Sequence, residues 1–161
     1  MDCAKCHSET GYVDFLGADG TEAGVVDNPA PVDTVVSCTV CHNPVAVELT
    51  TVTFPSGAEV EVGSSARCMV CHQGRESGAS VASAIEAAGV GLDEPSADLR
   101  FINIHYFAAA ATLFGSEVQG GYEYDGKQYV GQFTHVPQYD TCVDCHMGPN
   151  RINHTMEPKT E

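Results

Sequence analysis

Every cysteine in this chain belongs to one short motif, Cys-x-x-Cys-His, which occurs four times in 161 residues. The eight thiols belong to Cys3, Cys6, Cys38, Cys41, Cys68, Cys71, Cys142 and Cys145, and the histidines that follow are His7, His42, His72 and His146. Two thiols three positions apart can form thioethers with the two vinyl groups of one haem, while the next imidazole reaches the iron. The pattern therefore predicts four covalently bound haem c groups, with the motif histidines as proximal iron ligands.

Three other uses of paired cysteines explain this pattern less well. A zinc site does not require a histidine after the second cysteine. A disulfide scaffold accounts for an even number of cysteines but not for their fixed spacing. A thioredoxin-like redox pair normally occurs once, near a βαβ pattern. The repeated motif favours haem over all three.

The histidines outside the motifs are His105, His135 and His154, which we expect to be distal iron ligands. His154 also lies in an Asn-x-Thr glycosylation sequon, which is an alternative reason for its presence. Seven histidines cannot fill eight axial positions, and exchange between identical subunits cannot supply the eighth, because each chain that receives a histidine also gives one.

The eighth position is left open among a methionine, a lysine, the terminal amine, water, another protein or a missing segment. A methionine ligand would raise the potential of its haem above that of bis-histidine neighbours. Met69 lies inside a motif and is poorly placed. The candidates in the sequence are Met156 and Met147, which we favour marginally, and Met1 and Lys5.

Composition limits the partners and the location. The 22 acidic and 7 basic residues give a net charge of −15, which disfavours a nucleic-acid partner, since phosphate binding needs a basic surface. No apolar run approaches the roughly 18 residues needed to span a bilayer. Cys3 follows the first residue almost at once, so we expect a mature form, or a fragment, that lacks its signal peptide.

The sequence predicts a single domain over residues 1–161, with low secondary structure: a small α+β fold of one or two helices and short hairpins around a haem stack. Four haems leave about 40 residues for each, so much apolar burial would be of protein against cofactor. The expected elements are loop and short strand over 8–37, a hairpin over 49–62, a helix over 80–88 that ends at Gly89, a helix over 96–114 from Ser96 to Gly115 that carries His105, and a hairpin around Asp125-Gly126.

Residues 103–147 carry Asn103-Ile104-His105-Tyr106, an alanine run, Gly120-Gly121-Tyr122, Thr134-His135-Val136 and the last motif. This stretch resembles multihaem cytochromes of metal-reducing bacteria. The whole chain resembles the tetrahaem extracellular cytochromes that polymerise into conductive filaments, in which haems stack across subunits with bis-histidine ligation. The resemblance implies a homopolymer with some axial ligands exchanged between subunits.

These observations together predict an electron carrier, not an enzyme, that passes electrons to redox partner proteins or to an external acceptor. Haem attachment outside the cytoplasm implies an extracellular or cell-surface location, with the periplasm as the alternative. One alternative function is a small multihaem reductase with one open axial site, although no Arg or Lys cluster suited to an oxyanion is visible. Another is a haem subunit of a membrane oxidoreductase.

Overall fold

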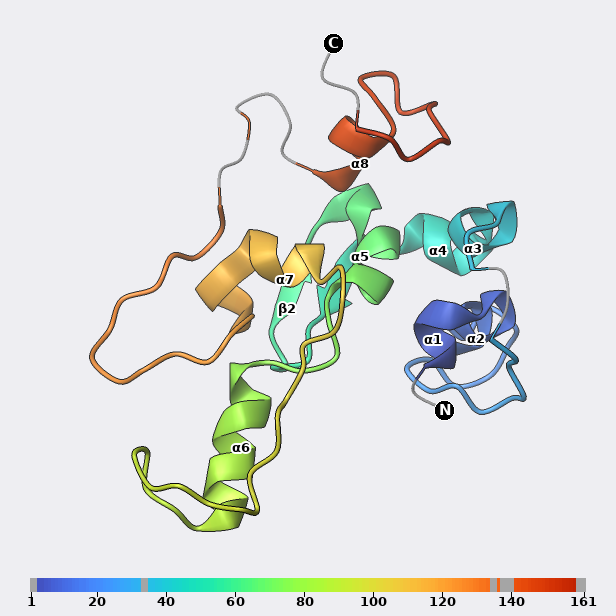
Figure 1. Ribbon diagram of the computed structural model, residues 1–161. Coiled ribbons are helices and arrows are strands. Elements are labelled where there is room, and N and C mark those ends of the chain that lie inside the picture. Colours follow the sequence, from blue (N-terminus) through green and yellow to red (C-terminus); the bar gives the residue numbers. More distant parts are fainter. Residues whose placement is uncertain (1–2, 33–34, 134–135, 137–140, 159–161) are drawn as a thin grey trace. The chain divides into compact units, whose positions relative to one another are not determined.

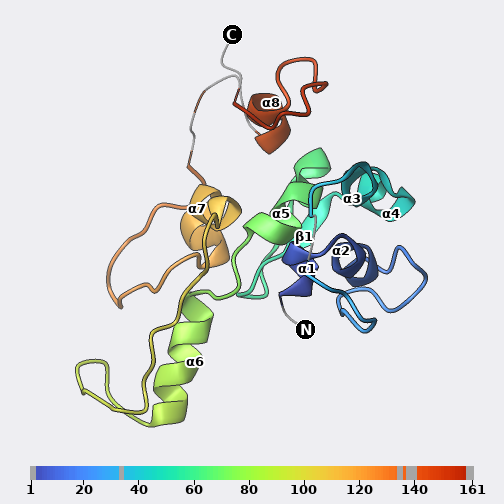
Figure 2. The ribbon, with the colours of Figure 1, turned by 45° about the vertical axis from the view of Figure 1, so that its right-hand side comes forward.

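The computed structural model describes residues 3–32, 35–133, 136 and 141–158. Within these residues it contains eight short α-helices, two 3₁₀ turns and one two-stranded sheet, joined by long irregular segments (Figures 1 and 2). None of the described helices is long and apolar enough to cross a membrane. The low content of regular structure confirms the predicted small α+β class, but the expectation of only one or two helices is wrong. Haem wrapping stays a prediction.

The chain divides into two compact units, which we describe separately. Unit 1 comprises residues 1–51 and 61–71, and unit 2 comprises residues 52–60 and 72–161. The single-domain organisation expected from the sequence stays a prediction.

Unit 1 begins with two helices that lie side by side, α1 (Ala4–His7) and α2 (Glu9–Phe15). Ser8 separates them, and its hydroxyl accepts a hydrogen bond from the backbone N–H of Gly11, which caps α2. A Cβ at Gly11 would lie 2.5 Å from the carbonyl oxygen of Ala4, so only glycine allows this approach. The predicted loop or strand over 8–37 is therefore wrong at α2, because the Ser8 cap outweighs the irregular composition.

Residues 17–32 of unit 1 form an irregular loop, as expected. The buried carboxylate of Asp14 holds this loop in place. It accepts hydrogen bonds from the backbone N–H of Asn28 and from the hydroxyl of Thr21, both at 2.8 Å. These bonds, above all the one from the Asn28 backbone, lower the pKa of Asp14.

The core of unit 1 forms around Tyr12, which is fully buried. Helices α3 (Cys38–His42) and α4 (Pro44–Glu48) follow the loop, with Asn43 capping α4. The phenol of Tyr12 donates to the carbonyl oxygen of Arg67 at 2.9 Å, and burial raises its pKa, so the hydroxyl stays protonated. The buried members of this core are Tyr12, Leu16, Val40, Ala46 and Val70.

The hairpin expected over 49–62 is confirmed. Strands β1 (Thr51–Thr53) and β2 (Glu59–Glu61) form the only sheet in the described part of the chain. Gly57 occupies the turn with φ of 87°, and its N–H donates to the carbonyl of Phe54. The 3₁₀ turn Gly63–Ser65 and helix α5 (Ala66–His72) follow.

Unit 2 contains the longest helix, α6 (Gly78–Ala88), and it ends at Gly89 with φ of 64°, which confirms the predicted helix and its stop. Helix α7 (Ala109–Phe114), the 3₁₀ turn Gly115–Val118 and helix α8 (Cys142–His146) come later. The ring of Phe114 packs edge-on against Phe54, with centroids 5.8 Å apart. This contact buries both rings in the core of unit 2.

The helix predicted over 96–114 is wrong for residues 96–108, and Ser96 caps no helix. His105 and Phe107 have φ angles of 87° and 54°, which a right-handed helix cannot contain. The alanine run supports a helix only from Ala109, and the predicted stop at Gly115 is confirmed. His105 therefore lies on an irregular segment.

The predicted turn at Asp125-Gly126 is present, because Gly126 has φ of 72° and the N–H of Lys127 donates to the carbonyl of Tyr124 at 3.1 Å. The expected strands on either side of it do not form in the residues described there. The phenol oxygen of Tyr129 accepts a hydrogen bond from the N–H of Tyr124, at 3.0 Å. The Tyr124 N–H therefore bonds to a side chain and not to a backbone carbonyl of a facing strand. The predicted turn is present, but the predicted strands of this hairpin are wrong.

Candidate functional site

Each Cys-x-x-Cys-His motif is built on a helix of one or two turns: α1 with Cys3 as its N-cap, α3, α5 and α8. Residues i, i+3 and i+4 share one face of a helix, so the two cysteines and the histidine of a motif point the same way. The residues between the cysteines turn toward the core, and the buried ones are Ala4, Val40, Met69, Val70 and Val143. All four motif histidines are exposed. Of the motif cysteines, Cys3 and Cys38 are exposed and the other six are partly buried.

Two motif histidines are held by backbone carbonyls. Nδ1 of His72 lies 2.8 Å from the carbonyl oxygen of Phe107, and Nδ1 of His146 lies 2.8 Å from that of Met156. A carbonyl oxygen only accepts, so Nδ1 carries the proton and donates it, and the lone pair is on Nε2. Iron-binding histidines are usually oriented in this manner. The donor set therefore fits a haem iron bound through Nε2.

The predicted distal ligands differ in their surroundings. His154 donates from Nδ1 to the carbonyl of Ile152 at 2.9 Å, which again puts the lone pair on Nε2. His105 has the left-handed φ noted above. Its backbone N–H donates to Oδ1 of Asn103 at 2.9 Å. Its ring centroid lies 5.6 Å from that of Tyr106. His135 lies outside the described residues.

The second cysteines of the first and third motifs lie together in unit 1. Sγ of Cys6 lies 4.0 Å from the carbonyl oxygen of Val70, and Sγ of Cys71 lies 3.8 Å from that of Lys5. A hydrogen bond between the thiols of Cys6 and Cys71 is the main cause that raises the pKa of Cys71, and burial is the second. Burial also raises the pKa of Cys41. Sequence spacing gives no signal for this pairing, because 64 residues separate Cys6 from Val70.

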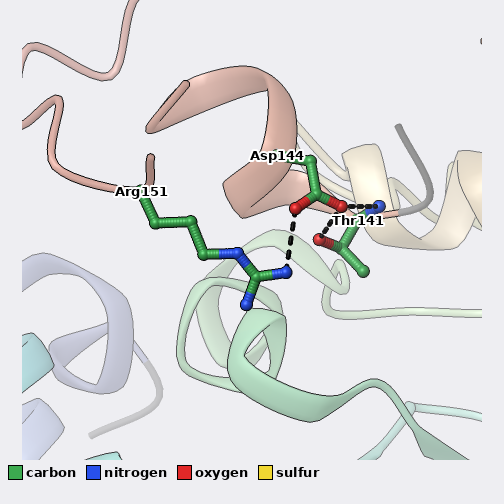
Figure 3. A network of polar contacts seen from close by, with 3 residues as sticks. All are labelled: Thr141, Asp144 and Arg151. Atoms are coloured by element: carbon green, nitrogen blue, oxygen red, sulfur yellow. Dashed lines mark hydrogen bonds and ion pairs between the residues drawn. The ribbon is translucent and has the colours of Figure 1, made fainter. Parts of the chain in front are cut away.

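In the fourth motif, Asp144 comes between the two cysteines in the sequence. Figure 3 shows its carboxylate in contact with Thr141 and Arg151. The carboxylate accepts from the N–H and hydroxyl of Thr141 at 3.2 and 2.8 Å, and from the guanidinium of Arg151 at 2.9 Å. The Thr141 hydroxyl, and then Arg151, hold the pKa of Asp144 below its ordinary value. The network caps α8 and ties the segment after it to the motif.

The structure also bears on the candidates for the eighth axial position. The ammonium of Lys5 lies 4.8 Å from the centroid of the Phe15 ring, in a cation–π contact. Met69 is buried, as expected for a motif residue in the core. Met156 approaches the fourth motif through its carbonyl oxygen. Met147 caps the end of α8, and Met1 lies outside the described residues.

Large aromatic side chains are exposed in unit 2, where the histidines outside the motifs occur. Six of the eleven Phe and Tyr residues in the described part of the chain are exposed: Phe101, Tyr106, Phe107, Tyr124, Tyr129 and Phe133. Apolar side chains of this size are normally covered. The described residues contain no group of three or more His, Cys, Asp or Glu suited to a bare metal ion. Paired thiols, oriented imidazoles and exposed apolar side chains fit haem, whose porphyrin supplies the other iron ligands.

Four Cys-x-x-Cys-His motifs, two of them with histidines oriented by carbonyls, are typical of a multihaem c-type cytochrome, and relatives agree with this class. The C-type polyheme cytochrome OmcB of Geobacter sulfurreducens, in two strains, is 30% identical over 205 aligned positions, which take in 99% of this chain and 26% of the relative. The C-type polyheme cytochrome OmcC of the same species is 29% identical over 191 positions, 90% of this chain and 23% of the relative. Over nearly its whole length the chain is therefore similar to multihaem c-type cytochromes, which supports this class for it.

The chain spans about a quarter of the length of the curated relatives it matches. No protein-family profile matches the chain. No solved structure matches it either.

Proposed function

We propose that the chain binds four haem c groups and transfers electrons through them. The cysteine pairs of the four motifs form the thioethers, and His7, His42, His72 and His146 are the proximal ligands. The observation that carries this proposal is that the motif histidines are exposed and that carbonyl oxygens at 2.8 Å orient two of them, His72 and His146. When bound, each haem supplies an iron that gains and loses one electron.

The protein's part is to attach, space and tune these groups. The contact of Cys6 and Cys71 with each other's motif supports close spacing of two attachment sites, which favours fast transfer between them. His105, His135 and His154 are proposed as distal ligands, and the eighth position stays open. In this proposal the chain is an electron carrier and not an enzyme.

The haem count is tested by mass spectrometry of the denatured chain after acid–acetone extraction. We expect the chain to retain the mass of four haems, because thioethers survive denaturation. A matched variant, Cys142→Ser with Cys145→Ser, should retain three. A chain that loses its haem into the solvent would show that the attachment is not covalent and would defeat the proposal.

We propose an extracellular or cell-surface location, with redox proteins or an external acceptor as partners. The argument is that haem attachment takes place outside the cytoplasm. Cell fractionation with a periplasmic marker distinguishes this location from the periplasm. Recovery of the haem-loaded chain only with the periplasmic marker would contradict a surface location.

End-to-end assembly into filaments is the finer part of this proposal. It rests on the resemblance described above and on the exposed aromatic side chains of unit 2, which a second copy could cover. The net charge of −15 opposes association, so assembly should strengthen as salt screens it. Electron microscopy of the haem-loaded protein across a salt series tests this. Discrete monomers at every ionic strength would exclude filaments.

A further inference from the structure

The two carbonyls that hold motif histidines belong to residues with an uncommon backbone. Phe107 has φ of 54° and Met156 has φ of 58°. Only five non-glycine residues in the described part of the chain have positive φ, and these two both accept from Nδ1 of a motif histidine. Neither phenylalanine nor methionine favours this region, so its surroundings must hold each residue there. Two such coincidences point to a shared purpose.

We infer that Phe107 and Met156 are positioning residues for His72 and His146. The left-handed backbone aims each carbonyl at Nδ1, which fixes the ring orientation and increases the electron donation from Nε2. A stronger donor stabilises ferric iron, so both haems acquire lower potentials than they would have without these bonds. With haem bound, the Nδ1 proton would stay on each imidazole, held by the carbonyl oxygen, in either oxidation state of the iron. This inference rests on the proposed haem binding.

The same geometry assigns a different role to Met156 from the one expected from the sequence. Nδ1 and Nε2 point away from each other on the imidazole ring. A residue whose carbonyl bonds Nδ1 of His146 therefore lies on the side of the ring away from an iron at Nε2. Met156 acts on that iron from behind the proximal histidine, through its backbone, and its thioether is not the opposite axial ligand.

A rival explanation is that the side chain of Phe107 matters and its backbone does not. The ring is 84% exposed and could cover a haem edge as an apolar wall. Glycine and valine separate the two explanations, since both remove the ring. Glycine adopts positive φ at no steric cost, whereas β-branched valine is strongly disfavoured there.

The experiment compares Phe107→Gly and Phe107→Val in the haem-loaded full chain, with Phe101→Val as the control. Phe101 is an exposed aromatic residue of the same segment and is not among the positive-φ residues. We expect Phe107→Val to raise one midpoint potential by about 59 mV, which is a tenfold change for a one-electron couple. Phe107→Gly and Phe101→Val should leave all midpoints unchanged. Equal shifts in the glycine and valine variants would overturn the inference.

The pair Met156→Gly and Met156→Val repeats the test on an independent segment. Spectroelectrochemical titration should show one raised midpoint in the valine variant only, and the ferric low-spin electron paramagnetic resonance signals should stay intact in the glycine variant. Loss of a low-spin signal in Met156→Gly would identify the thioether as a ligand and overturn the assignment.

Haem content separates this inference from the proposed function. If the wild-type chain retains no haem mass on denaturation, the proposed function fails. If it retains haem but the glycine and valine variants titrate alike at both positions, only the positioning role fails. If Phe107→Val does not load haem, two tests still decide whether the positioning role holds. They are the midpoint potentials of Phe107→Gly, which should be unchanged, and the comparison of the two Met156 variants.

Discussion

The two compact units use their aromatic residues in opposite ways. Unit 1 buries Tyr12 at the centre of its core and contains no exposed Phe or Tyr among its described residues. Unit 2 buries Phe54 and Phe114 but exposes six others. Unit 1 thus forms a core from its own side chains, whereas unit 2 presents apolar surface suited to a bound group or a partner.

The histidines follow the same division. In unit 1 both histidines, His7 and His42, belong to motifs, while all three histidines outside the motifs occur in unit 2. Three of the five left-handed non-glycine residues among the described residues lie within two positions of His105 or His154, and all five belong to unit 2. The three histidines proposed as distal ligands therefore all belong to unit 2, whereas motif histidines occur in both units.

Among the tests of this difference between the units, removal of the His105 imidazole has the largest expected effect. His105→Ala in the haem-loaded chain should convert one haem from low-spin to high-spin and shift its potential, because an axial ligand is lost. Optical and electron paramagnetic resonance spectra check this, with Phe101→Ala as the control in the same segment. Added imidazole should restore the low-spin spectrum. An unchanged spectrum with full haem loading would remove His105 from the set of ligands.

The core of unit 1 should be more sensitive to truncation than the aromatic surface of unit 2. Tyr12→Ala removes a fully buried ring and its bond to the Arg67 carbonyl, which should cost about 3–5 kcal/mol of unfolding free energy. Phe101→Ala, at a side chain that is 91% exposed, should change it by less than about 0.5 kcal/mol. Denaturant unfolding followed by circular dichroism measures both. Similar losses in the two variants would contradict the contrast between the units.

The sequence predicted those elements that local signals specify. The motif chemistry needs only the spacing of Cys and His, the hairpin follows from Gly57 in its turn, and the helix stops at Gly89 and Gly115 follow from glycine at a left-handed or turn position. Relatives named as polyhaem cytochromes confirm the class that the motifs predicted.

Contacts between distant residues account for the failures. The left-handed backbone at Phe107 is tied to His72, 35 positions earlier, so no local pattern could reveal that the helix starts at Ala109. The pairing of Cys6 with Cys71 is equally non-local. Helix α2 was missed for a different reason: its Ser8 cap was present in the sequence, but glycine-rich and acidic neighbours obscured it.

Each unit contains a glycine that lies close to a backbone carbonyl oxygen. Replacing either glycine with alanine should lower the free energy of unfolding by a similar amount. A Cβ at Gly11 of unit 1 would lie 2.5 Å from the Ala4 carbonyl oxygen, and one at Gly78 of unit 2 would lie 2.4 Å from the Gly121 carbonyl oxygen. Gly11→Ala and Gly78→Ala should each cost about 1–3 kcal/mol. Gly121→Ala, which meets nothing within 4 Å, is the matched control. Denaturant midpoints equal to that of the control would show that neither approach is tight.

The smallest expected effect concerns Asp144, whose contacts support the last motif of unit 2. Its lowered pKa means that the carboxylate stabilises the folded chain above the ordinary pKa of 3.8, and that this stability is lost as pH falls through the lower folded pKa. Asp144→Asn weakens the capping of α8 and the ion pair with Arg151, so it should cost about 1 kcal/mol at pH 7.

The difference between Asp144→Asn and wild type should therefore shrink as pH falls below about 4, because the wild-type carboxylate becomes protonated there. Asp98→Asn, at an exposed side chain, provides the control for loss of one negative charge from a chain of net charge −15. Hydrogen exchange at the Met147 N–H, which donates to Val143 at the end of α8, reports the capping locally. Faster exchange in Asp144→Asn at pH 7 but not in Asp98→Asn would support the role of the carboxylate. Equal exchange in both would mean that the motif helix is held by its buried Val143 and not by its cap.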